Sequence, residues 1–184
     1  MPREIFHREG APCVAMRTVL RIIDSISDRT GVGLSWFCGA LVLLLCFEVV
    51  SRYVFNSPTK WSYESATHMG VLIAYGGWAY VLRHRAHVRI DIIYAHLSPK
   101  GKAVVDLICD LFLFFPLITA MTYAAVNKLL FSLSMNEILT ETNWYPPAWP
   151  IRIIVLLGLC MFLLQGVAEF TRNLYFLMRN RAYE

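Results

Sequence analysis

The sequence predicts an all-α integral membrane protein: a bundle of four transmembrane helices, with interfacial amphipathic helices at the N-terminus and in mid-chain. Two observations predict this fold. Hydrophobic residues make up 57% of the 184 residues and charged residues only 16%, whereas an ordinary soluble domain carries about 25% charge. The apolar residues also gather in four windows that approach the ~20 residues needed to cross a bilayer. Because backbone polar groups in hydrocarbon must bond within their own segment, each window should be a helix.

The predicted spans begin and end at recognisable residues. Glu48 is the one charged residue in the apolar stretch of the first span, and Pro116 should kink the third because proline removes a backbone hydrogen bond. The fourth span contains Gln165. We expect the spans at about residues 31–53, 64–82, 99–131 and 150–176. They form one membrane domain, residues 17–184, after an N-terminal extension, residues 1–16, that is either disordered or a mis-assigned start.

Two amphipathic patterns flank the spans. Apolar residues recur at helical spacing before the first span, at Met16, Val19, Leu20, Ile23 and Ile26, with Arg17, Arg21, Asp24 and Asp28 on the other face. This pattern predicts a short helix in the membrane interface, and the alternative is an extension of the first span. A second interfacial helix is predicted after span two, from Ile90, Ile93, Tyr94 and Leu97.

The basic residues predict the orientation. Thirteen of the 17 Lys and Arg residues lie in residues 1–30, the connection 83–102 and the tail 172–184. Positively charged loops stay in the cytoplasm, so both termini and the second connection are placed in the cytoplasm. The spans themselves are expected in the inner membrane of a bacterium. An even number of spans requires the same arrangement. The basic loop lies beside spans, so its charge is explained by topology and does not indicate nucleic-acid binding.

Packing and polar signals lie at the other ends of the spans. Glu48 and Arg52 are one turn apart and can pair, with Glu64 nearby; we expect structural pairing or subunit contact, and ion or substrate binding is the alternative. Small residues that allow close helix packing recur every fourth position, at Ser62, Ala66, Gly70 and Ala74. Trp144, Tyr145 and Trp149 suit an aromatic belt at the headgroup level.

Other functional classes find weaker support. His68 lies inside the second span, where it could ligate haem, but no second histidine lies at a matching depth. The five cysteines form no CxxC pair. Gly101-Lys102 is not a phosphate-binding loop, because the upstream glycine and the following Ser or Thr are missing, so ATP hydrolysis is not expected. A haem-binding or non-haem membrane anchor of a redox complex remains the alternative function.

Four motifs stand in order across the predicted spans: Glu48-x-x-x-Arg52-Tyr-Val-Phe-Asn56, Pro58 followed by Trp61-x-x-Glu64, His87-x-x-x-Asp91, and Pro147-x-Trp149. In this order they resemble the small permease subunit of tripartite ATP-independent periplasmic (TRAP) transporters, the DctQ-like family. The resemblance covers about residues 18–176. Residues 1–15 do not match.

The resemblance implies a scaffold and no enzyme. Such proteins pair with a large membrane permease that carries the substrate and sodium sites, and a periplasmic binding protein delivers the solute, typically an organic acid. We therefore expect no cofactor, no metal and no catalytic residue. Structural or subunit-interface roles are expected for Glu48, Arg52, Trp61, Glu64, Gly70, Ala74, Asp91 and Trp149.

Overall fold

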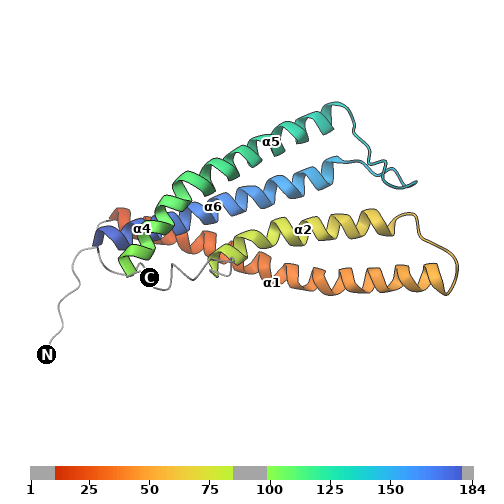
Figure 1. The fold of residues 1–184 in the computed structure, drawn as a ribbon, viewed down its shortest axis with the longest axis horizontal. Coiled ribbons are helices and arrows are strands. Elements are labelled where there is room, and N and C mark those ends of the chain that lie inside the picture. Colours follow the sequence, from red (N-terminus) through yellow and green to blue (C-terminus); the bar gives the residue numbers. More distant parts are fainter. Residues whose placement is uncertain (1–10, 85–98, 180–184) are drawn as a thin grey trace.

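The computed structural model describes residues 11–84 and 99–179, which are helical apart from two connecting loops (Figure 1). Within these residues no strand forms, and the loop after α5 holds a single antiparallel bridge between Ile138 and Pro147. The elements are α1 (Ala11–Tyr53), α2 (Ser62–Arg83), α4 (Pro99–Cys109), the π-helical turn η1 (Asp110–Phe114), α5 (Phe115–Ser134) and α6 (Trp149–Arg179). The all-helical fold predicted from the sequence is confirmed for this part of the chain.

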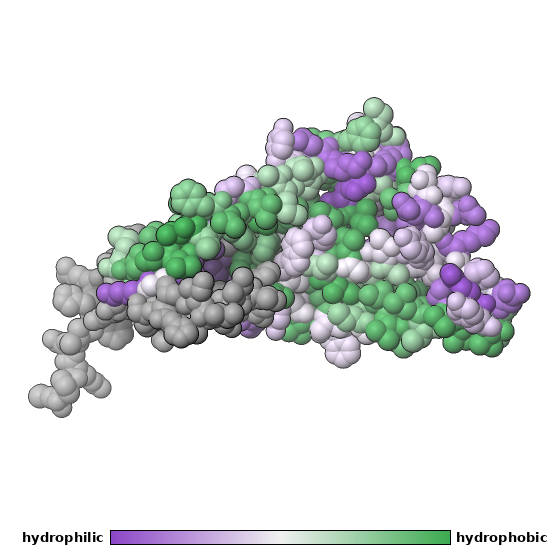
Figure 2. All heavy atoms as spheres, viewed as in Figure 1, coloured by the Kyte–Doolittle hydropathy of each residue, from purple (hydrophilic) through white to green (hydrophobic). Residues whose placement is uncertain are grey.

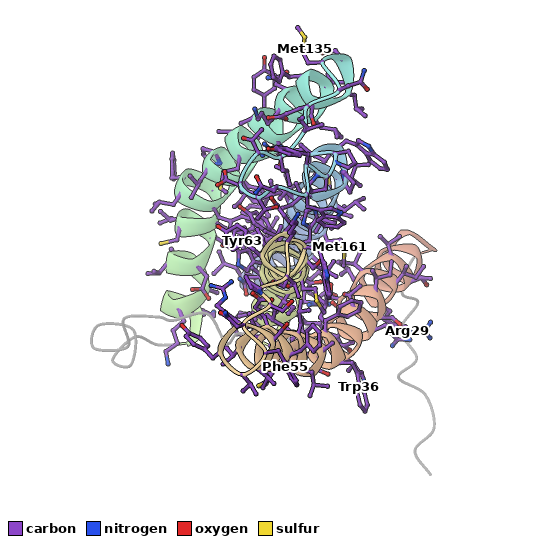
Figure 3. All side chains as sticks on the ribbon, turned by 90° about the vertical axis from the view of Figure 1, so that its right-hand side faces the viewer. Arg29, Trp36, Phe55, Tyr63, Met135 and Met161 are labelled. Atoms are coloured by element: carbon purple, nitrogen blue, oxygen red, sulfur yellow. The ribbon has the colours of Figure 1, made fainter. Side chains whose placement is uncertain are left out.

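The long helices lie side by side in one layer, in the order α1, α2, α6, α5 (Figure 1). α2 packs between α1 and α6, and α6 also contacts α4 and α5. Few apolar side chains are buried by this arrangement: Leu20, Ala79, Ala103, Ile118, Ala148, Leu159, Phe162 and Ala168. Much of the surface over the helices is therefore apolar (Figure 2), and Trp36 points away from the layer with 79% of its surface exposed (Figure 3).

Three helical segments are long and apolar enough to cross a membrane: Thr18–Tyr53, Lys100–Ser134 and Trp149–Met178. They coincide with the first, third and fourth predicted spans. α2 matches the second predicted span in position, but it is not among the three. Its polar and small residues, including Glu64, His68 and Gly70, reduce its mean hydropathy. The sequence-based count of four spans is thus not confirmed by length and composition alone.

The N-terminal amphipathic pattern forms part of α1, which continues without interruption into the first span. The two aspartates of its polar face point inward, where Asp24 and Asp28 make ion pairs with side chains of α6 and α2, whereas Arg21 is exposed. Val19 and Ile26, from its apolar face, are about half exposed. The alternative expected from the sequence, a continuation of the span, describes this helix. The second amphipathic pattern, residues 90–97, lies outside the described residues.

The third span contains an irregular turn just before Pro116. The five residues of η1 are π-helical, and the Phe115 N–H bonds back to the Asp110 carbonyl, five residues earlier. Proline has no N–H to donate and crowds the preceding turn, so the wider π turn accommodates it. The chain changes direction here, between α4 and α5 (Figure 1). The kink predicted from Pro116 thus corresponds to this turn.

Two glycines of α6 allow its neighbours to approach closely. A Cβ at Gly158 would lie 2.8 Å from the backbone carbon and oxygen of Tyr75 on α2. A Cβ at Gly166 would overlap the ring of Phe114, which belongs to the π turn. Close backbone contact through small residues is the usual way in which helices pack in a membrane. The central contacts of the layer therefore depend on these two positions.

Candidate functional site: polar clusters at the two ends of the layer

A charged cluster joins three helices at the end of the layer where α1 begins and α6 ends. We call it the clasp. It consists of Asp24, Ser27 and Asp28 from α1, Arg83 and His84 from the end of α2, and Gln165, Glu169 and Arg172 from α6. Residues more than 130 positions apart in the sequence bond here, so the clasp holds the first and last helices together.

Asp24 is the centre of the clasp. Its carboxylate accepts hydrogen bonds from the Arg172 guanidinium and from Gln165 Nε2, the latter at 3.2 Å. Gln165 is fully buried, and its Oε1 accepts a bond of 2.9 Å from the Ser27 hydroxyl. Arg172 also donates to Glu169 Oε1 at 2.6 Å. Asp24, Ser27 and Gln165 therefore bond across the α1–α6 contact, as buried polar groups need where water is scarce.

The end of α2 joins the clasp through Arg83. Its guanidinium donates to the Asp24 backbone carbonyl and forms an ion pair with Asp28. His84 Nε2 lies 3.4 Å from Asp28 Oδ1, and its ring packs against Tyr80 with 4.3 Å between centroids. Three carboxylates thus face two arginines and one histidine, so the arginines of the clasp are paired within the protein. Such internal pairing favours a structural role for the cluster over binding of a charged solute.

Sequence reasoning did not identify the clasp. It noted the polar residues Asp24 and Asp28 only as the outer face of an interfacial helix. One signal was available: acidic residues at the start of the first span and Arg172 at the end of the fourth lie at the same membrane depth when both termini share a side. Charges buried beside apolar segments need partners. Their equal depth in the membrane therefore indicates Arg172 as a partner of these acidic residues.

At the opposite end, the predicted pair of Glu48 and Arg52 is formed. Arg52 Nη2 lies 2.7 Å from Glu48 Oε1, and Arg52 Nε is 3.2 Å from the same oxygen. The other carboxylate oxygen accepts bonds from the hydroxyl and the backbone N–H of Thr59 in the loop after α1. Glu48 is buried, whereas the Arg52 side chain is 53% exposed. The pair therefore fixes the turn between α1 and α2, with Arg52 on the outside.

Glu64 does not join that pair. It lies in the first turn of α2 with 1% of its surface exposed, and its Oε1 accepts a hydrogen bond of 3.2 Å from Thr142. A carboxylate in the first turn is stabilised by the positive end of the helix dipole. Because Thr142 belongs to the loop between α5 and α6, this bond connects that loop to the start of α2.

The α5–α6 loop is held by a second group of charges. Glu137 Oε1 lies 3.1 Å from Lys128 Nζ and 3.4 Å from Arg152 Nη2. The hydrogen bond from Lys128, together with the charge of Arg152, holds the pKa of Glu137 below its usual value. Backbone bonds from Leu139 to Pro146 and from Ala148 to Glu137 close the loop. This group ties the end of α5 to the start of α6.

The remaining predicted positions lie apart from these groups. Trp61 stacks on Phe47 with 6.4 Å between ring centroids, and Trp149, the first residue of α6, is 44% exposed. A Cβ at Gly70 would meet no atom within 4 Å, and Ala74 is exposed. This half of the small-residue stripe on α2 therefore has no neighbour among the described residues. Asp91 lies outside the described residues.

The sequence is similar to a known protein family over most of its length. The family model for the DctQ component of tripartite ATP-independent periplasmic transporters matches residues 41–175. A relative from Vibrio cholerae serotype O1, described as the C4-dicarboxylate TRAP transporter small permease protein DctQ, is 25% identical over 148 residues. The match covers 78% of this chain and 56% of the relative, so the chain spans only about half the length of that protein. Because the family model covers most of the chain, including the α1–α2 turn and the α5–α6 loop, the chain belongs to the DctQ family of TRAP transporter components and is not an enzyme.

Proposed function

We propose that this chain is the small scaffold subunit of a Na⁺-coupled TRAP transporter that imports a small organic acid. In this proposal a large permease subunit binds the solute and Na⁺, and a periplasmic binding protein delivers the solute. The observation that carries the proposal is the arrangement of the helices in a single layer (Figure 1). Protein domains normally bury their apolar faces between at least two layers, so this layer needs lipid and a protein partner to cover it.

The solute class is suggested by the relative and not by any pocket. The name of the Vibrio cholerae protein specifies a C4-dicarboxylate. The polar groups of the two ends mostly bond to one another, as in the clasp, where both arginines are paired with carboxylates. We therefore assign solute and Na⁺ binding to the large permease, and support of that permease to this chain.

The membrane topology is the second part of the proposal. We propose four spans in the bacterial inner membrane, with α2 as the second span and both termini in the cytoplasm. α2 has 22 residues, which is about 33 Å of helix at 1.5 Å per residue, and it lies between two of the apolar helices (Figure 1). The sorting of basic residues supports this orientation.

The proposed permease contacts use residues left open by the layer. Gly70 and Ala74 present a small-residue surface on α2, and Arg52, Trp61 and Trp149 are exposed at one end. Glu48 in α1 and Glu64 in α2 would stabilise that end through their bonds to loop residues, Thr59 and Thr142 respectively. Asp91 is also proposed to contact the permease, because it belongs to the His87-x-x-x-Asp91 motif.

The proposal is tested by transport in proteoliposomes. The large permease would be reconstituted with and without this chain, and Na⁺-driven uptake of a C4-dicarboxylate would be measured with the binding protein outside. We expect uptake only when this chain is present. Full uptake by the permease alone would contradict the scaffold role, and a Soret band in the purified chain would favour the redox-anchor alternative.

The topology is tested by labelling single cysteines in intact spheroplasts with a membrane-impermeant thiol reagent. A cysteine-free variant carrying Asn143→Cys should react at once, because its loop is placed in the periplasm. The same variant carrying Lys102→Cys should react only after permeabilisation. The reverse pattern would contradict the proposed orientation.

A further inference from the structure

A notch of about 550 Å³ lies on α5, near the end that leads into the α5–α6 loop. It is lined by Tyr123, Ala124, Asn127, Lys128 and Phe131. Tyr123, Asn127 and Phe131 are four residues apart and therefore share one face of the helix. Ala124 leaves the space between them open. α5 is the outermost helix of the layer, with α6 as its neighbour (Figure 1).

The charge beside the notch is positive. Lys128 and Arg152 share a single carboxylate oxygen, Glu137 Oε1, at 3.1 and 3.4 Å, so two cations face one anion. The ammonium of Lys128 has three donors, and the bond to Glu137 uses one of them. It also lies 5.0 Å from the centroid of the Phe131 ring, and 46% of the side chain is exposed. Lys128 can therefore bind an anion without breaking its ion pair.

Two uncharged polar groups extend the positive region along the helix. The Asn127 side chain is exposed, and 70% of Tyr123 is exposed. Neither side chain makes a hydrogen bond with any other residue in the described part of the chain. In a membrane such groups need partners, because hydrocarbon offers none. An amide, a phenol and an ammonium along one face provide several donors for a single ligand.

We propose that this notch binds the headgroup of an anionic phospholipid. The phosphodiester would accept hydrogen bonds from Lys128 and Asn127, and the Tyr123 and Phe131 rings would flank the glycerol and the first acyl carbons. Lys128 lies one to two turns before the end of α5, close to the headgroup level that Trp149 is predicted to mark. The inference requires only that α5 lies in a bilayer, and it is independent of the proposed transporter partners.

A lipid fits the notch better than a helix of a partner protein. Basic residues near a membrane surface attract anionic lipids, and Lys128 is a half-exposed base near the end of α5. A partner helix would need an acidic side chain at the headgroup level to compensate Lys128. Lipid supplies that anion directly, and acyl chains also cover the apolar side of α5.

The test is native mass spectrometry of the purified full chain, with any copurifying permease, in detergent. Dioleoyl phosphatidylglycerol would be titrated against dioleoyl phosphatidylcholine. We expect one phosphatidylglycerol adduct that is preferred over phosphatidylcholine. Lys128→Gln should weaken it about fivefold, since one basic residue near an anionic surface contributes roughly 1 kcal/mol. The matched control is Lys60→Gln, which removes the same charge from an exposed position in the α1–α2 loop and should leave the adduct unchanged.

Because Lys128→Gln also removes a loop ion pair, Ala124→Trp provides a second variant, which fills the notch without changing any charge. It should also lose the adduct. The proposal is overturned if both lipids bind equally, or if Ala124→Trp retains full binding. It is also overturned if a cysteine at position 124 crosslinks to another protein in native membranes, since a protein would then occupy the notch.

Discussion

The two ends of the layer are both polar, but they are stabilised differently. In the clasp, three helices bond directly to one another, and its partners, such as Asp24 and Arg172, are distant in the sequence. At the opposite end the ion pairs are local: Glu48 bonds within its own helix and turn, and Glu137 within its own hairpin. A side-chain bond from Thr142 to Glu64 joins the α5–α6 loop to the start of α2 there.

This difference assigns different roles to the ends. The clasp fixes how α1, α2 and α6 lie relative to each other, whereas each loop at the opposite end is held separately. Changes in the clasp should therefore affect the whole layer, and changes at the other end should affect one hairpin or a partner contact. Five substitutions or conditions can break or sharpen this comparison, and they are ordered here from the largest expected effect.

Arg172→Gln should be the most damaging change. It removes the cation that pairs with both Asp24 and Glu169, and breaking a buried ion pair from one side typically costs about 3 kcal/mol. We expect a large loss of thermal stability in detergent, measured by the temperature at which the protein unfolds and aggregates. Adding Asp24→Asn should recover part of the loss. Additive effects in the double variant would show that the two residues act independently.

Gly158→Ala should be the next most damaging. The new Cβ would lie 2.8 Å from the Tyr75 backbone, so α2 and α6 must separate at their closest contact, and overpacking of this kind costs about 1–3 kcal/mol. Gly70→Ala is the matched control, since its Cβ has free space, and the isolated chain should keep or slightly gain stability. Equal losses in both variants would contradict the described packing. Loss of permease copurification in Gly70→Ala alone would identify a contact with the partner.

Thr142→Val tests the bond between Thr142 and Glu64, which joins the α5–α6 loop to the start of α2. Removing the hydroxyl leaves the buried Glu64 carboxylate without this donor, which should cost about 1 kcal/mol. We expect faster limited proteolysis in the α5–α6 loop, while the clasp helices remain protected. Glu64→Ala in the complex goes further: unchanged transport and unchanged copurification with the permease would refute a structural role for Glu64.

The Glu137 group predicts a loss of stability in acid. The pKa of Glu137 is lowered in the folded protein, so the folded state binds a proton less readily than the unfolded chain. Its stabilising contribution is therefore complete at neutral pH, above the ordinary glutamate pKa of about 4.3, and is lost as the pH falls through the lowered value. The loop of the wild type should lose protease protection over this acid range. A Glu137→Gln variant that lost the same protection over the same range would show that other groups are responsible.

Arg52→Ala should have the smallest effect on the isolated chain. Arg52 is 53% exposed, and solvent-exposed pairs at this helical spacing contribute about 0.3–0.5 kcal/mol. The buried Glu48 carboxylate keeps its bonds to Thr59. Unfolding in detergent should be almost unchanged. If copurification with the permease falls sharply while stability does not, Arg52 contacts the partner. If neither changes, Arg52 has no role at this end.

The sequence predicted the helices well because apolar windows and turn residues are local signals. The predicted spans 31–53 and 150–176 compare with α1 ending at Tyr53 and α6 covering Trp149–Arg179. The pair of Glu48 and Arg52 followed from one turn of helix and is confirmed. The clasp and the bond between Glu64 and Thr142 depend on how distant helices lie side by side, which no local pattern specifies.

The N-terminal part of α1 shows that an amphipathic pattern does not by itself specify which way each residue points. For a helix beside water, polar residues such as Asp24 and Asp28 are expected to point outward. Here they point toward α2 and α6, and Val19 and Ile26 are about half exposed. In apolar surroundings the preference is reversed, because polar groups find partners only within the protein.

The clasp also has a consequence for the order in which the chain assembles. The ribosome delivers the helices to the membrane from the N-terminus, so α1 arrives with its carboxylates long before α6. Of the two arginines in the clasp, Arg83 is made first, and it forms ion pairs with both Asp24 and Asp28. It can neutralise them while the second half of the chain is still being made. Arg172 joins the group last, so the clasp is complete only when the final helix lies beside the first.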